Sequence, residues 1–77
     1  MTDPMRKMFL DLKATYNNAV LFIKLGEFYE VFYEDADLIQ RVFGEKRYQL
    51  RVGCADKYIK VLNAQGIPVQ IVEERNP

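Results

Sequence analysis

A single glycine between two strand-like runs is the feature that most constrains the fold of this chain. Residues 19–25 form a run rich in β-branched and aromatic side chains, and Gly26 separates it from a second such run over residues 28–33. Two runs of this kind with a turn residue between them predict a β-hairpin.

The second run, Phe28-Tyr-Glu-Val-Phe-Tyr33, also alternates. Side chains two residues apart on a strand share a face. One face then holds Tyr29, Val31 and Tyr33, which can serve as the core, and the other holds Phe28, Glu30 and Phe32. A flat ring beside a carboxylate suits the reading of a DNA base, by stacking and by accepting a hydrogen bond. Ordinary packing is the more common reason for such a pattern.

An amphipathic helix is predicted before the hairpin. Apolar side chains recur at i, i+3, i+4 and i+7 between Met5 and Leu12, which is the spacing of one helix face. Thr2 or Asp3 can cap this helix, and Pro4 suits its first turn. We expect the helix to end near Tyr16.

Four more elements are predicted after the hairpin. Acidic residues open a helix that Gly44 ends, an alternating segment follows as a half-buried strand, and a third helix with Tyr58, Ile59 and Leu62 inward ends at Gly66. The expected spans are residues 34–43 for the second helix, 48–52 for the third strand, 55–65 for the third helix and 69–72 for the last strand.

The resulting order, α-β-β-α-β-α-β, predicts an α/β (α+β) fold for a single small domain over residues 1–77. We expect a mixed sheet of about four strands flanked by about three helices. The hairpin is antiparallel by construction, whereas strand-helix-strand connections are normally parallel.

Composition excludes several classes of function. Eleven basic residues balance eleven acidic ones, so the chain does not bind nucleic acid by bulk charge. With no histidine and one cysteine, Cys54, it lacks the usual zinc ligands, the common nucleophilic triads and an intrachain disulfide. It also lacks an apolar run long enough to span a bilayer and the pattern of a signal peptide. We expect an intracellular protein that is not an enzyme and uses no metal or cofactor.

The block from Phe22 to Ala36, Phe-Ile-Lys-Leu-Gly-Glu-Phe-Tyr-Glu-Val-Phe-Tyr-Glu-Asp-Ala, resembles the signature of the N-terminal mismatch-recognition domain of the MutS family of DNA mismatch repair proteins. Residues 2–13 resemble the opening helix of that domain, and residues 58–66 and 69–74 resemble its helix and final strand. The resemblance implies the MutS N-terminal fold. The segment between Gly44 and Tyr58 is shorter than the family pattern, and we expect this chain to act without the connector, lever, clamp and ATPase domains of the family.

The resemblance also implies roles for two side chains. Phe28 would insert beside a mispaired or unpaired base, and Glu30 would hydrogen-bond that base. The implied partner is double-stranded DNA with a mismatch or distortion, bound weakly by this chain alone, together with other mismatch repair proteins or a second copy. The alternative is a protein-interaction or oligomerisation module that keeps the fold and has little affinity for DNA.

Charged residues leave two readings open. One is a set of phosphate contacts beside Phe28, and the other is a solvated strand edge neutralised by nearby acids. The basic residues concerned are Lys24, Lys46, Arg47 and Arg51, with Arg41 as a further candidate. Glutamates and aspartates at positions 27, 30, 34, 35 and 37 resemble a metal-binding set, but a helix N-terminus favours acids at the last three positions in any case.

The remaining candidates favour structural roles. Cys54 lies near the start of the third helix and is expected to be a small buried residue rather than a reactive thiol. Tyr16, Tyr48 and Tyr58 are expected in the core or at its edge.

Overall fold

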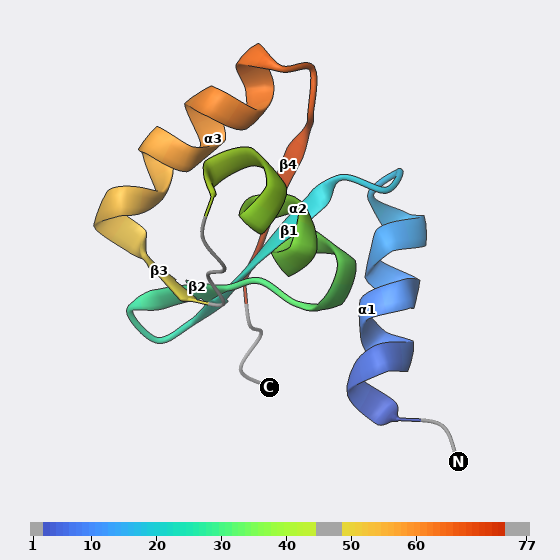
Figure 1. Ribbon diagram of the computed structural model, residues 1–77. Coiled ribbons are helices and arrows are strands. Elements are labelled where there is room, and N and C mark those ends of the chain that lie inside the picture. The colour runs from blue at the N-terminus through green and yellow to red at the C-terminus, as the bar shows by residue number, and fades with distance from the viewer. Residues whose placement is uncertain (1–2, 45–48, 74–77) are drawn as a thin grey trace.

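The computed structural model describes residues 3–44 and 49–73 of the chain. The elements in chain order are α1 (Pro4–Thr15), β1 (Val20–Leu25), β2 (Phe28–Glu30), α2 (Tyr33–Phe43), β3 (Gln49–Arg51), the short 3₁₀ turn η1 (Val52–Cys54), α3 (Ala55–Ala64) and β4 (Val69–Glu73). Figure 1 shows these elements along the chain. The predicted order and the predicted α+β class, a mixed four-stranded sheet with three helices, are confirmed.

The strands lie in the order β3-β2-β1-β4. β1 is antiparallel to β2 and parallel to β4, so the sheet is mixed as predicted. The expectation of a parallel connection through α2 is wrong, because β2 and β3 are antiparallel. Glu30, the last residue of β2, pairs with Gln49, the first residue of β3. β3 therefore begins beside the end of β2, whereas a parallel crossover would return the chain to the place where β2 begins.

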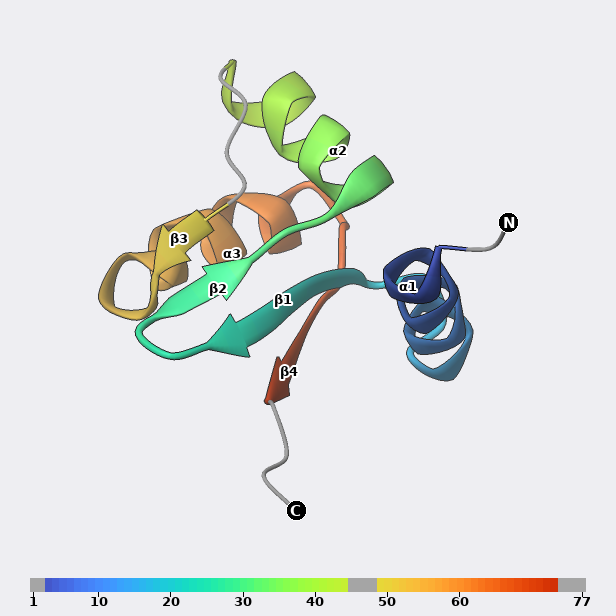
Figure 2. The ribbon, with the colours of Figure 1, turned by 90° about the horizontal axis from the view of Figure 1, so that it is seen from below.

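Two apolar clusters lie on opposite faces of the sheet. The larger one packs α2 and α3 against one face, and its buried members are Val20, Phe22, Tyr29, Val31, Ala36, Ile39, Leu50, Ala55 and Leu62. The smaller one joins α1 to the other face through Phe9, Leu21 and Ile23. Figure 2 shows α2 and α3 together on one side of the sheet, and α1 beside the end where β1 begins. As a result, α1 does not cover the hairpin end of the sheet face on which it packs.

The hairpin turns through Gly26 and Glu27, with Leu25 opposite Phe28. Gly26 has a φ of 65°, a left-handed conformation that glycine adopts without the steric penalty of a Cβ atom. Glycine at the first loop position is typical of the two-residue turns whose twist matches the strands.

The second strand of the hairpin is shorter than predicted, and Tyr33 does not join the core face of Tyr29. β2 ends at Glu30, so strand alternation stops there, and Tyr33 begins α2 with a φ of 51°. Its ring packs edge-on against Phe9, with centroids 5.2 Å apart, in the smaller cluster. Phe32 packs against the same cluster instead of extending the surface of Phe28.

The apolar face predicted for α1 is buried only in part, because Phe9 is buried whereas Met5 and Met8 are exposed. Other expected side-chain patterns hold. Asp3 caps α1, since its carboxylate accepts a hydrogen bond from the Met5 amide at 3.0 Å. In β3, Leu50 is buried between the exposed Gln49 and Arg51, and Tyr48 lies outside the described residues. In α3, Leu62 is buried, and its neighbours on the same face are half-buried. Among the described helices, none is long and apolar enough to cross a membrane.

Candidate nucleic-acid interface

Phe28 and Glu30 lie on one face of β2, as the alternation predicts, with the buried Tyr29 between them pointing to the opposite face. The register extends this surface to the edge strand, because Phe28 is opposite Arg51 and Glu30 is opposite Gln49. Directly opposed residues of an antiparallel pair point to the same side of the sheet. We call this surface the reading face, and its members are Phe28, Glu30, Gln49 and Arg51.

The reading face stays accessible because of where α1 packs. Phe9 and its neighbours on α1 contact Leu21 and Ile23 of β1, toward the middle of the sheet. Phe28 and Glu30 lie one strand further toward the edge, and both are half-buried. The ring and the carboxylate are thus both partly accessible to solvent.

Side chains of the edge strand β3 contact both Phe28 and Glu30 of β2. The Gln49 Nε2 atom donates a hydrogen bond to Oε1 of Glu30 at 2.8 Å. The guanidinium carbon of Arg51 lies 5.9 Å from the centroid of the Phe28 ring, within the range of a cation–π interaction. Each candidate reading residue therefore has one partner on β3.

An open hollow of about 460 Å³ lies at the hairpin end of this surface. Two glycines, Gly26 and Gly53, contribute only backbone to its wall, and the Val52 amide donates a hydrogen bond to the Glu27 carbonyl at 3.1 Å. This bond ties η1 to the hairpin loop. The hollow is lined by Lys24, Gly26, Glu27, Phe28, Arg51, Val52, Gly53 and Cys54.

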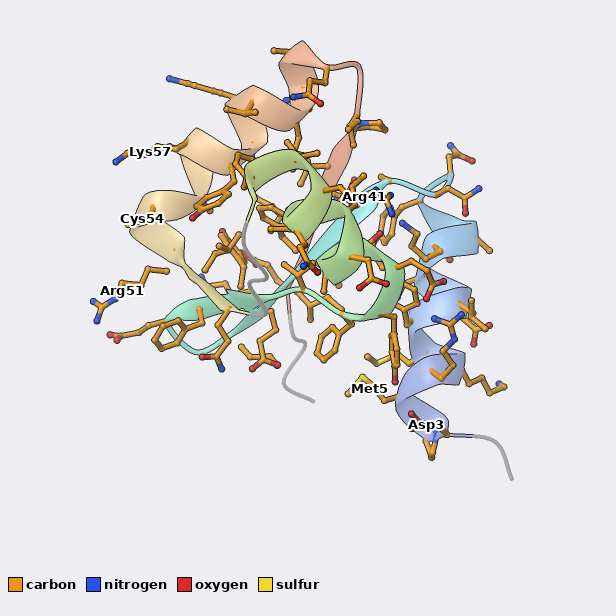
Figure 3. All side chains as sticks on the ribbon, in the orientation of Figure 1. Asp3, Met5, Arg41, Arg51, Cys54 and Lys57 are labelled. Atoms are coloured by element: carbon orange, nitrogen blue, oxygen red, sulfur yellow. The ribbon has the colours of Figure 1, made fainter. Side chains whose placement is uncertain are left out.

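The structure brings together only some of the candidate phosphate contacts. Arg51 is exposed on the reading face, and Figure 3 shows it at the hairpin end of the molecule, far from Arg41 on α2. Lys24 lines the hollow, but the register places it on the face of Tyr29, and its ammonium lies 4.0 Å from a carboxylate oxygen of Glu73. Two further candidates, Lys46 and Arg47, lie outside the described residues.

The acidic residues serve different purposes. Asp35 is 3% exposed: one of its oxygens accepts from Lys13 Nζ at 2.8 Å and the other accepts from the Leu21 amide at 2.9 Å. Glu34 accepts hydrogen bonds from the two terminal guanidinium nitrogens of Arg6, and this pairing lowers the pKa of the Glu34 carboxyl group. Within residues 3–44 and 49–73, no three acidic or sulfur ligands gather into a set that could hold a metal ion.

The expectation of a buried Cys54 is wrong, because its side chain is exposed. It ends η1, directly before α3, where the chain turns at the edge of the sheet. Ala55, the next residue, takes the buried position against the core instead. Figure 3 shows Cys54 on the same side of the molecule as Arg51.

Sequence reasoning missed Gln49 as a member of the site. The alternation of β3 indicates that Gln49 is a polar residue on the exposed face of a strand. It does not indicate Glu30 as the partner, because this pairing depends on the antiparallel register of β2 and β3.

Comparison with known proteins identifies the family. A family model described as MutS domain I matches residues 3–76. The chain is 35% identical to the DNA mismatch repair protein MutS of Thermosipho melanesiensis over 92% of its length, 37% identical to that of Desulforamulus reducens over 92%, and 38% identical to that of Shouchella clausii over 96%.

The chain spans about a tenth of the length of these relatives. The aligned regions run over 79, 84 and 86 positions, more than the 77 residues of this chain. The relatives therefore carry residues within the aligned region that this chain lacks. With the match over residues 3–76 and the shared α+β architecture, the chain belongs to the MutS domain I family.

Proposed function

We propose that this chain is a DNA-binding module that reads mismatched or distorted duplex DNA, with Phe28 as a wedge and Glu30 as a hydrogen-bond acceptor for a base. The observation that carries the proposal is the placement of a half-buried ring and a half-buried carboxylate side by side on an open sheet face. The module binds and has no catalytic step of its own, and the proposal places it inside the cell with the DNA.

The wedge follows from the energetics of base stacking. Opening a step between stacked bases costs a few kcal/mol, and the cost is lower where pairing is already poor. An apolar ring that inserts at such a step selects the site by its deformability. Phe28 is suited to this role because it lies directly after the hairpin turn and beside an open hollow.

The position of Glu30 is informative because a carboxylate repels phosphates. An ionised carboxylate only accepts hydrogen bonds, so its favourable partners in DNA are the amino and imino groups of bases. Next to the wedge, Glu30 is placed to meet the edge of a base that Phe28 has unstacked. A negative charge on a general DNA-binding surface would only weaken binding.

The charge of the chain predicts weak binding. Its formal net charge is zero, and the cations that line the hollow beside Phe28 are Arg51 and Lys24, of which Arg51 lies on the face of Phe28. So few phosphate contacts supply little non-specific affinity. We therefore propose that further parts of a mismatch repair protein, or a partner, hold the duplex while this module reads it.

Fluorescence anisotropy tests the proposal with a labelled duplex that carries one G·T mismatch or one unpaired thymine, and with its fully paired counterpart, at low salt. The native chain should bind the defective duplex more tightly. Phe28→Ala should abolish this preference, and Glu30→Gln should reduce it. Val61→Ala on α3, where the side chain is 40% exposed, is a control for Phe28, and Glu27→Gln in the hairpin loop is a control for the loss of one negative charge.

Equal affinity of the native chain for the two duplexes, or a preference that survives Phe28→Ala, would refute the proposal. The alternative function, a protein-interaction module, then predicts association with other mismatch repair proteins or with itself, and sedimentation velocity would detect either.

A further inference from the structure

We propose that Gln49 is a positioning residue that holds the Glu30 carboxylate in place for base recognition. The inference rests on the proposed function, and it adds a specificity determinant on the edge strand β3. Gln49 acts through Glu30 alone.

The geometry of the contact carries the inference. Gln49 and Glu30 are directly opposed in the register of β2 and β3, and the amide nitrogen lies 2.8 Å from Oε1 of the carboxylate. A carboxylate cannot donate, so the amide must present its nitrogen, which fixes the orientation of both groups. In an antiparallel pair, such opposed side chains are held at close range by the backbone ladder.

Among the described residues, the contact uses one of the two carboxylate oxygens of Glu30. An ionised carboxylate offers two oxygens with about four lone-pair sites. Gln49 engages Oε1, and no hydrogen bond from another described residue reaches Oε2. A base donor therefore meets an acceptor whose rotamer is already fixed.

A neutral amide is the suitable partner for this purpose. Lysine or arginine at position 49 would form an ion pair with Glu30 and would compete with the base for the carboxylate. Arg51 lies on the same face of the same strand, but its guanidinium lies over the Phe28 ring. The edge strand thus holds Glu30 with a neutral donor, and its positive charge stands over the wedge.

The energetic benefit comes from pre-organisation. Ordering a flexible side chain on binding costs about 0.5–1.5 kcal/mol, and a glutamate that is already held avoids this cost. Loss of Gln49 should therefore reduce the preference for a mismatched over a paired duplex by about two- to tenfold. Affinity for the paired duplex should not change, because the paired duplex gives Glu30 no base to meet.

The test is a double-mutant cycle with the same two duplexes, using the full 77-residue chain. Gln49→Ala and Glu30→Ala should each lower the mismatch preference, and the double variant should equal Glu30→Ala alone. Gln70→Ala is the matched control, because Gln70 lies on the other edge strand and its side-chain nitrogen bonds only the Ile71 carbonyl among the described residues. Gln49→Glu should lower the mismatch preference more than Gln49→Ala does, because like charges would face each other across the strands.

Additive effects of Gln49→Ala and Glu30→Ala would overturn the inference, as would a preference that is unchanged in Gln49→Ala while Glu30→Ala loses it. A merely structural role for Gln49 would lower binding of both duplexes equally and would not couple to Glu30. Absence of any mismatch preference in the native chain would instead refute the proposed function, and this inference with it. Unchanged circular dichroism would verify that the variants fold.

Discussion

Replacement of Asp35 by alanine should destabilise the chain more than any other loss of a single charge among the described residues. The Asp35 side chain is 5% exposed and joins three elements. Through Lys13 it contacts α1, through the Leu21 amide it contacts β1, and it belongs to the first turn of α2. Its removal leaves the ammonium of Lys13, 15% exposed, without its counter-ion.

The magnitude follows from the environment of Lys13. Removal of one partner of a buried ion pair costs about 3–5 kcal/mol. Lys13 keeps hydrogen bonds to the carbonyls of Asn18 at 3.1 Å and Ala19 at 2.8 Å, so we expect about 3 kcal/mol, the lower end of this range. A domain of this length has a total stability of about 4–12 kcal/mol, so the loss is a large part of it.

Urea and thermal unfolding followed by circular dichroism measure the effect. The midpoint temperature should fall by about 12–24 °C. Asp56→Ala is the matched control, because Asp56 is an exposed acid in the first turn of α3 and tests the helix-terminus effect alone, about 0.3–1 kcal/mol. The double variant Lys13→Met with Asp35→Ala should recover part of the loss. If Asp35→Ala were no more harmful than Asp56→Ala, the buried pair would not link the elements as described.

Three further predictions concern charge and exposure. The logarithm of the DNA association constant should fall with the logarithm of the salt concentration at a slope of about −0.9 if Arg51, which lies on the face of Phe28, neutralises one phosphate. Arg51→Gln should bring this slope close to zero, and a slope that the substitution leaves unchanged in anisotropy titrations would contradict the assignment. Arg6 lowers the pKa of Glu34, so this pair stabilises the fold above the ordinary glutamate pKa of about 4.3, and the contribution disappears as the pH falls through the lowered pKa. Arg6→Gln should therefore be less stable than the native chain at neutral pH. In urea titrations at acidic pH, the difference in stability between the variant and the native chain should shrink. Cys54 should react with a thiol reagent as fast in the native chain as in urea, and strong protection of the native thiol would contradict its exposure.

The elements of the fold could be predicted because each has a strong local signal. The hairpin has Gly26 at its turn and apolar runs on both sides, and α1 has an aspartate cap followed by proline. The common face of Phe28 and Glu30 required only strand alternation across three residues. Local patterns of this kind do not depend on the rest of the chain.

What could not be predicted depends on contacts between distant segments. The alternation continues in the sequence as far as Tyr33, but the backbone leaves the sheet after Glu30, where the ring of Tyr33 meets Phe9 and the Asp35 carboxylate meets Lys13. These partners lie more than 20 positions away in the chain. The antiparallel pairing of β2 with β3, and with it the contact of Gln49 to Glu30, is likewise set by the return path of the chain after α2.

A measurement of base stacking beside a mismatch tests most directly the central claim that Phe28 is inserted as a wedge. A duplex with 2-aminopurine next to the mismatch reports unstacking as a rise in fluorescence, because stacking quenches this base. The account predicts a rise when the native chain binds the mismatched duplex, no rise with the paired duplex, and no rise with Phe28→Ala at concentrations that saturate binding. A fluorescence that stays quenched with the native chain, or that rises equally with Phe28→Ala, would contradict the assignment of Phe28 as the wedge.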